Sequence, residues 1–181
     1  MAKAIDPVYF LGFANQSGII YYQRFLITED NEIEYLDSAM PVYDSANEQA
    51  SEDSPFHISS IGDGLVYFGY SEPSGNGDVY LQKIDFNGVG IWNSPKLVAN
   101  NNGDDIVKGL FPIDDHCIVI YEIADYPIYE VRLARINNNG EVFNNWNNIL
   151  ISQDGDKARF ESAVRTNTGV FISWRNKDNN K

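Results

Sequence analysis

The stretch Val66-Tyr67-Phe68 recurs after 52 residues as Ile118-Val119-Ile120, and after 52 more as Val170-Phe171-Ile172. Residues 79–88 map at the same spacing onto residues 131–140, with no gap between the two copies. A constant spacing of this length is the signature of repeat architectures, in which each unit buries its apolar faces against its neighbours. The chain is therefore predicted to be a tandem array of similar units.

A looser copy of the unit begins at Val8-Tyr9-Phe10. It is longer than the other copies, and the surplus falls in residues 44–54, an acidic, serine-rich stretch that we expect to be an exposed insertion loop. We interpret the chain as a single repeat domain over residues 1–181. Its predicted units cover residues 8–65, 66–117 and 118–169, followed by a partial unit at residues 170–181.

Each unit has the pattern of four short strands. The run that opens a unit is apolar at consecutive positions, which is typical of a strand covered on both faces by neighbouring sheets. The turns Asp85-Phe86-Asn87-Gly88 and Asn137-Asn138-Asn139-Gly140 both end in Asn-Gly, and these residues tolerate the positive φ angles of tight hairpin turns. Glu29-Asp30-Asn31 holds this place in the first unit. Since no segment has a sustained 3.6-residue apolar period, the fold class is predicted to be all-β.

The formal net charge is −13, with 26 acidic and 13 basic side chains. Such a charge opposes binding to nucleic acid or to an anionic membrane surface. No run of 18 apolar residues is present, so we expect no membrane insertion. The start of the chain lacks the apolar segment of a signal peptide, so we expect either a cytoplasmic protein or a piece of a larger exported chain. The single cysteine, Cys117, cannot form a disulfide within the chain, and its apolar neighbours predict that it packs in the core.

Four-stranded units of roughly 40–50 residues are typical of β-propeller blades. Residues 78–92, DVYLQKIDFNGVGIW, resemble repeats of many secreted bacterial proteins, in which Ile-Tyr-x-Gln-Arg-Leu-Asp-x-Asn-Gly precedes a Trp. Residues 169–175, GVFISWR, resemble the Gly-x-Ile-Val-x-Trp-x strand of the same repeats. The third unit departs from the pattern because Trp146 is offset by two residues from Trp92. The resemblance implies a propeller-like fold, a non-enzymatic surface role, and an extracellular or cell-surface location.

The predicted architecture is a β-propeller-like array of four-stranded antiparallel blades, with about three full units plus one strand. Closed propellers have about four or more blades, so one copy is too short to close a ring of such blades. An open array would expose unpaired sheet edges, which soluble proteins avoid. We therefore expect a homo-oligomer, or a chain that is part of a longer one.

Carboxylates cluster in two equivalent turns, and these carboxylates are the candidate calcium ligands. Ca²⁺ takes six to eight oxygen ligands, and Asn-Gly-Asp sequences supply several. Neither turn has the spacing of a dedicated calcium loop, and the same residues are ordinary turn formers, so no metal site is expected. The calcium candidates are Asp104, Asp105, Asp154 and Asp156.

Aromatic side chains supply the candidate ligand-binding residues. Tyr126 and Tyr129 belong to a predicted loop between two strands, and Trp146 follows a hairpin turn. Exposed aromatic residues in loops suit recognition, although packing between units would use the same residues. His57 and His116 are interpreted as surface or turn histidines.

No catalytic constellation is found in the sequence. It has no nucleophile elbow, no glycine-rich phosphate loop before a helix, and no pair of carboxylates singled out for glycoside hydrolysis. No catalytic residues and no cofactors are therefore expected. The main hypothesis is a non-enzymatic binding, adhesion or scaffolding module that recognises protein or glycan. One alternative is a catalytic fragment of a propeller-type glycoside hydrolase, and another is a structural unit that assembles with its own copies.

Overall fold

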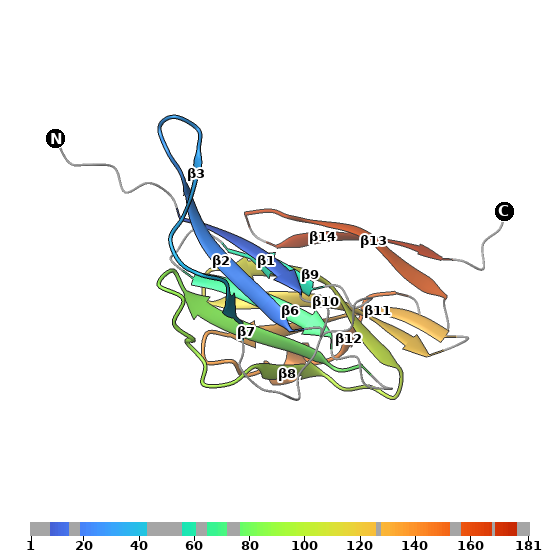
Figure 1. Cartoon of the computed structure of the whole chain (residues 1–181). Helices are drawn as coiled ribbons and strands as arrows, with labels where there is room; N and C mark the ends of the chain where they lie inside the picture. The colour runs from blue at the N-terminus through green and yellow to red at the C-terminus, as the bar shows by residue number, and fades with distance from the viewer. Residues whose placement is uncertain are drawn as a thin grey trace.

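The computed structural model describes residues 8–14, 19–42, 56–60, 65–71, 77–125, 128–152, 157–167 and 169–176. These residues form antiparallel β-sheets, here called A to D, and a short 3-10 helix, η1 (Asn144–Trp146). The prediction of an all-β fold with four-stranded antiparallel sheets is confirmed (Figure 1). No helix in the described ranges is long and apolar enough to cross a membrane.

Sheets A and B come from the first half of the chain. Sheet A contains β1 (Tyr9–Ala14), β2 (Ile20–Ile27), β3 (Ile33–Tyr35) and β4 (Met40–Pro41), and β2 pairs with each of the other three. Sheet B has the order β5 (Phe56–Ser59), β6 (Leu65–Ser71), β7 (Val79–Asp85) and β8 (Lys96–Ala99). The predicted insertion at residues 44–54 lies outside the described residues.

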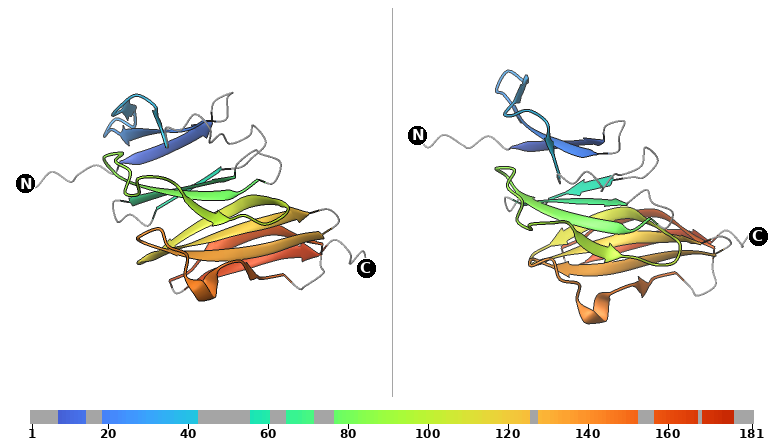
Figure 2. Two further views of the ribbon diagram at one scale, coloured as in Figure 1. Left: turned by 90° about the horizontal axis from the view of Figure 1, so that it is seen from below. Right: turned by 60° about the horizontal axis from the view of Figure 1, so that its bottom comes forward.

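Sheets C and D come from the second half. Sheet C has the order β9 (Asp104–Ile113), β10 (His116–Asp125), β11 (Ile128–Asn137) and β12 (Ile149–Leu150). Sheet D consists of β13 (Ala158–Arg165) and β14 (Val170–Asn176). Figure 2 shows A, B and C as successive layers, with D against the far side of C. In the described part of the chain this stack stays open and does not close into a barrel or ring.

The sheets begin one strand earlier than the predicted units. Strand β5 pairs with β6, and β9 pairs with β10, so each of these sheets starts before the apolar run that opens a unit in the sequence. A sequence repeat defines its period but leaves its starting point arbitrary. The hydrogen bonds between strands decide where one sheet ends and the next begins.

The register of the apolar strands also differs from the sequence alignment. Tyr67 pairs with Lys83 in sheet B, and Ile118 pairs with Arg135 in sheet C. Lys83 and Arg135 are 52 residues apart, but Tyr67 and Ile118 are one residue closer. The structural equivalent of Val66 is therefore Cys117, where the spacing alone predicted Ile118. A slip of one residue moves every side chain of a strand to the opposite face, so the distinction decides how the sheets pack.

In this register the sheets pack head to tail. Phe68 lies in the core between sheets A and B, its equivalent Val119 lies between B and C, and Ile172 of β14 packs between C and D. The same face of each sheet therefore covers the sheet that precedes it. Each fully buried Val, Ile or Leu in these layers contributes about 1.5–3 kcal/mol of burial free energy.

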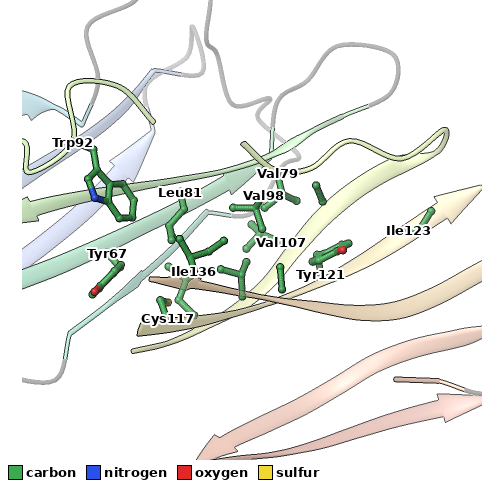
Figure 3. Close-up of a cluster of buried hydrophobic side chains, with 14 residues drawn as sticks. Tyr67, Val79, Leu81, Trp92, Val98, Val107, Cys117, Tyr121, Ile123 and Ile136 are labelled. Atoms are coloured by element: carbon green, nitrogen blue, oxygen red, sulfur yellow. The ribbon is translucent and has the colours of Figure 1, made fainter. Parts of the chain in front are cut away.

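The largest described core lies between sheets B and C. Figure 3 shows Leu81 of β7, Val98 of β8, Cys117 of β10 and Ile136 of β11 lying together in it. Cys117 has no exposed surface, and burial raises the pKa of its thiol to about 12. The prediction that Cys117 packs in the core is confirmed.

Two glycines let the first strand of one sheet approach the sheet before it. A Cβ atom on Gly69 of β6 would lie 2.8 Å from Cδ2 of Leu110 on β9. A Cβ on Gly12 of β1 would lie 2.7 Å from Cε2 of Phe56 on β5. Because both contacts join the apolar strand of one sheet to the first strand of the next, they are the same contact at successive interfaces.

Replacing Gly69 should open the interface between sheets B and C. In Gly69→Val the new methyl groups would overlap buried Leu110, and overpacking of this kind costs about 1–3 kcal/mol of the free energy of unfolding. Urea unfolding followed by tryptophan fluorescence measures the change. The control is Gly169→Val, where nothing lies within 4 Å of the added Cβ, and its cost should stay within about 0.5 kcal/mol. Equal unfolding midpoints for the two variants would contradict the assigned contact.

Candidate functional site

The two predicted Asn-Gly hairpin turns are confirmed, with the same internal hydrogen bonds in each. Gly88 and Gly140 both have φ = +81°. In the first turn, Oδ1 of Asp85 accepts from the backbone N–H of Asn87 at 2.9 Å, and also from that of Val89. Asn137 accepts two equivalent backbone hydrogen bonds in the second turn. A side chain that binds its own turn in this way holds the turn in a fixed shape.

A cation from the preceding sheet donates to each of these turns. Nη1 of Arg24 on β2 donates to the carbonyl oxygen of Phe86 at 2.6 Å. Nζ of Lys83 on β7 donates to Oδ1 of Asn138 at 2.6 Å, and Nε1 of Trp92 donates to the Asn138 carbonyl oxygen at 3.0 Å. Arg24 and Lys83 hold equivalent positions, because each pairs with a residue of the apolar strand that faces the following sheet. These contacts join A to B and B to C.

Arg135 is the equivalent cation of sheet C. It pairs with Ile118 on β10 as Lys83 pairs with Tyr67 on β6. Its Nε is buried and has no hydrogen-bond partner among the described residues. The guanidinium lies 4.3 Å from the ring centroid of Phe143 and 6.0 Å from that of Trp146. Arg24 holds its turn through Nη1 and donates its Nε to Asp37 in the loop after β3, so Arg135 differs from it in having a buried Nε without a partner in the described part of the chain.

A cavity of about 350 Å³ lies beside this guanidinium, between sheet C and β14. Most of its walls are aliphatic, and Trp146 is 42% exposed at its rim. Pockets with apolar walls and a few polar groups are typical of binding sites. We call this cavity and its lining the Arg135 site; its lining residues are Ile113, His116, Ile118, Leu133, Arg135, Trp146, Gly169, Val170 and Ile172.

One ring nitrogen of His116 lies close to two groups, and it can form a hydrogen bond with only one of them at a time. Its Nδ1 lies 2.9 Å from Oδ1 of Asp115 and 3.2 Å from Nη2 of Arg135. One ring nitrogen cannot donate to a carboxylate and accept from a guanidinium at the same time. The hydrogen bond from His116 lowers the pKa of Asp115. An acceptor placed in the cavity would satisfy Arg135 without depending on His116.

The three predicted ligand-binding aromatics have different placements. Trp146 lines the Arg135 site. Tyr129 lies on β11, and the guanidinium of Arg159 on β13 stacks 3.5 Å from its ring centroid. That stacking joins sheets C and D, and Tyr129 does not line the cavity. Tyr126 lies outside the described residues.

Arg135 and His116 were not predicted as site residues. The sequence marks Arg135 only as a match to Lys83, and the meaning of that match depends on the neighbouring sheet. His116 was interpreted as a turn histidine, and it does follow the two-residue turn after β9. The signal that could have found the site is the recurrence of a cation at Arg24, Lys83 and Arg135.

The calcium candidates in the described residues have structural partners. The carboxylate of Asp105 accepts from the backbone N–H and the side-chain amide of Asn101, and burial raises the pKa of Asp105. Oδ1 of Asp104 accepts from the backbone N–H of Gly77 at 3.2 Å. Asp154 and Asp156 lie outside the described residues. Where the chain is described, no cluster of three His, Cys, Asp or Glu could hold a metal ion.

The amide of Asn101 continues into a polar network that links sheets B and C. The side chain of Asn148 donates to Oδ1 of Asn101 at 2.8 Å, and Asn148 has a φ of +55°. Oδ1 of Asn148 accepts from the hydroxyl of Tyr121 at 2.9 Å and from Arg132 at 3.2 Å. Because these polar groups satisfy one another, the network is a structural link between the sheets.

Glu122 of β10 is a buried carboxylate at the junction of sheets C and D. Its oxygens lie 3.1 Å from Nζ of Lys108 and 3.4 Å from Nη1 of Arg159. It also accepts a hydrogen bond from the backbone N–H of Phe160 on β13. Two cations and a backbone donor use its lone pairs, so Glu122 fixes the first strand of sheet D against sheet C.

No protein-family model matches the chain, and no curated protein matches it significantly. Among solved structures, the chain is similar to the endo-arabinase from Bacteroides thetaiotaomicron VPI-5482, with 15% sequence identity and a TM-score of 0.35. The match covers 90% of this chain and 68% of the endo-arabinase. The interpretation of the Arg135 site therefore depends on its own geometry.

Removing the Glu122 carboxylate should weaken the junction of sheets C and D. Glu122→Ala leaves Lys108, Arg159 and the Phe160 N–H without their shared acceptor, which should cost about 3 kcal/mol of the free energy of unfolding. Urea denaturation measures this change.

The matched control is Glu161→Ala, which breaks an exposed ion pair with Arg175. Exposed pairs contribute less than about 1 kcal/mol. If Glu122→Ala proved no more costly than Glu161→Ala, the structural role assigned to Glu122 would be wrong.

Proposed function

We propose that the chain is a non-enzymatic, β-propeller-like binding and scaffolding module that recognises another protein through the Arg135 site. The blade-like interpretation is supported by the head-to-tail packing, in which the same sheet face covers the preceding sheet at three interfaces. A propeller repeats one interface between neighbouring blades in this manner. The repeated cation-to-turn contacts at two of these interfaces support the same interpretation.

The buried donor of Arg135 beside a half-exposed tryptophan is the observation that carries the recognition role. Arg and Trp are enriched at the centres of protein interfaces, where they supply most of the binding free energy. Phe171 and Val164, a cross-strand pair of sheet D, are 72% and 59% exposed. They lie on the face of sheet D opposite the one from which Val170 and Ile172 line the cavity, so they are outside the site.

The chemistry of the cavity favours a protein ligand over a glycan. A sugar presents many hydroxyl groups, and burying each one without a hydrogen bond carries a free-energy cost. Arg135, His116 and the indole N–H of Trp146 supply the hydrogen-bonding side-chain groups of a cavity whose other side chains are aliphatic. A peptide that places one carbonyl oxygen and one apolar side chain in the cavity would match these walls.

Asp105 and Glu122 are the fully buried carboxylates of the described residues, and they lie on different faces of sheet C. Asp105 pairs with Ile123, which belongs to the core facing sheet B, whereas Glu122 contacts Arg159 and Phe160 of sheet D. The two buried acids therefore project from opposite faces of sheet C. Glycoside hydrolysis needs two carboxyl groups that face each other across one cleft, and these two do not share a cleft.

Screening the protein against a displayed peptide library and a glycan array tests the proposed function. We expect peptide binding that Arg135→Ala weakens at least about tenfold, or about 1.4 kcal/mol. The control Arg175→Ala, whose side chain is 65% exposed on the outer face of β14, should bind as the unmodified protein does. Binding to glycans alone, or peptide binding that does not depend on Arg135, would count against the proposal. Turnover of chromogenic glycosides that one carboxylate replacement abolishes would support the hydrolase alternative instead.

A further inference from the structure

We infer that the Arg135 site accepts a β-hairpin from a protein partner, as a strand that pairs with β14 and leads into an Asn-Gly turn. This inference rests on the proposed function and adds the secondary structure and turn chemistry of the partner. Three observations carry it: the open edge of β14, the repeated role of the cation, and the composition of the cavity.

Strand β14 is the equivalent of β10, and both carry the same irregularity. The β9–β10 ladder has a bulge at Lys108, where the register shifts between Ile120 and Tyr121. The β13–β14 ladder has a bulge at Glu161, at the corresponding place. Since β10 lies between β9 and β11, a strand in the β11 position would lie on the other side of β14. Among the described residues β14 pairs with β13 alone, and β-augmentation adds a strand at a sheet edge of this kind.

The turn that such a strand would bring is the element that Arg24 and Lys83 hold. Arg24 donates to the Phe86 carbonyl in the turn after β7, and Lys83 donates to Asn138 in the turn after β11. In each case the cation belongs to one sheet and the turn belongs to the next. The turn follows the strand, β7 or β11, that pairs with the apolar strand, β6 or β10, of that next sheet. Arg135 is the cation that precedes sheet D, and its Nε lacks a partner in the described structure. A turn following a strand beside β14 would place its oxygens beside this guanidinium, as the turns at Phe86 and Asn138 do for Arg24 and Lys83.

The cavity lies where that strand and turn would pack. Its walls include Val170 and Ile172 of β14 on one side, and Arg135 with Leu133 of β11 on the other. At the two complete interfaces the apolar residue just before the turn, Ile84 or Ile136, is buried in the core. The aliphatic walls suit such a residue, and Trp146 is placed near the turn as Trp92 is near Asn138. The partner hairpin therefore has an apolar residue followed by an Asx-x-Asn-Gly turn.

The probe for this inference is a fluorescein-labelled synthetic peptide of residues 79–92, VYLQKIDFNGVGIW, which contains the required strand and turn. Fluorescence anisotropy measures its binding to the full chain. We expect Arg135→Ala to weaken binding at least tenfold and Arg175→Ala, on the outer face of sheet D, to leave it unchanged. Arg135→Lys should retain binding within about threefold, because Lys83 makes the equivalent contact with a lysine. Urea unfolding of each variant verifies that it is folded.

A second peptide tests the turn itself. The Gly88→Val peptide cannot readily adopt the φ of +81° that the turn needs, so its binding should fall at least tenfold. Backbone pairing should also slow amide hydrogen exchange along β14 when the first peptide is bound. Equal binding of the two peptides, or no change in exchange along β14, would overturn the inference.

The remaining outcomes separate this inference from the proposed function. If library peptides bind through Arg135 but the hairpin peptide does not, the proposed function stands and the hairpin inference fails. If no peptide of either kind binds, both fail. A dimer in sedimentation that Arg135→Ala dissociates, with no hairpin binding, would identify the occupant as a second copy and overturn the partner proposed above.

Discussion

The hydrogen bond from a buried or half-buried cation to the hairpin turn of the next sheet is the contact that fixes sheet A against B and sheet B against C. Arg24 and Lys83 each place their charge against an oxygen of an Asx-Gly turn, and the turn can accept because its own backbone is already satisfied. Hydrogen bonds to charged groups contribute about 1.5–3 kcal/mol each. Apolar layers by themselves would allow the sheets to slide, whereas this contact sets one position of each sheet relative to the next.

The use of basic residues follows from this constraint. The chain has half as many basic as acidic side chains, and several of the basic ones lie between sheets instead of on the open surface. Lys108 and Arg159 share Glu122 between sheets C and D, and Arg132 binds Asn148 near the junction of B and C. The excess negative charge is left to the surface, where it favours solubility.

Local chemistry could be predicted from the sequence, and relations between sheets could not. The all-β class and the Asn-Gly turns were predictable because hairpin turns depend on a few adjacent residues, and Gly88 and Gly140 adopt the expected positive φ. The register of β10 was not, since Val66, Tyr67 and Phe68 are all apolar and either face could pack inward. The face of sheet C on which Arg135 lies can be assigned only when that register is known. Of the candidate site, Trp146 alone was identified in advance, because an exposed aromatic after a turn is visible in sequence.

The buried thiol of Cys117 can report how often sheets B and C separate. A protonated thiol without solvent contact does not react with alkylating reagents, and a pKa near 12 keeps it protonated at neutral pH. Alkylation of Cys117 therefore requires sheets B and C to part, so its rate reports how often that interface opens. A ligand that clamps only the far end of the stack would leave the rate unchanged, whereas one that tightens the whole stack would slow it.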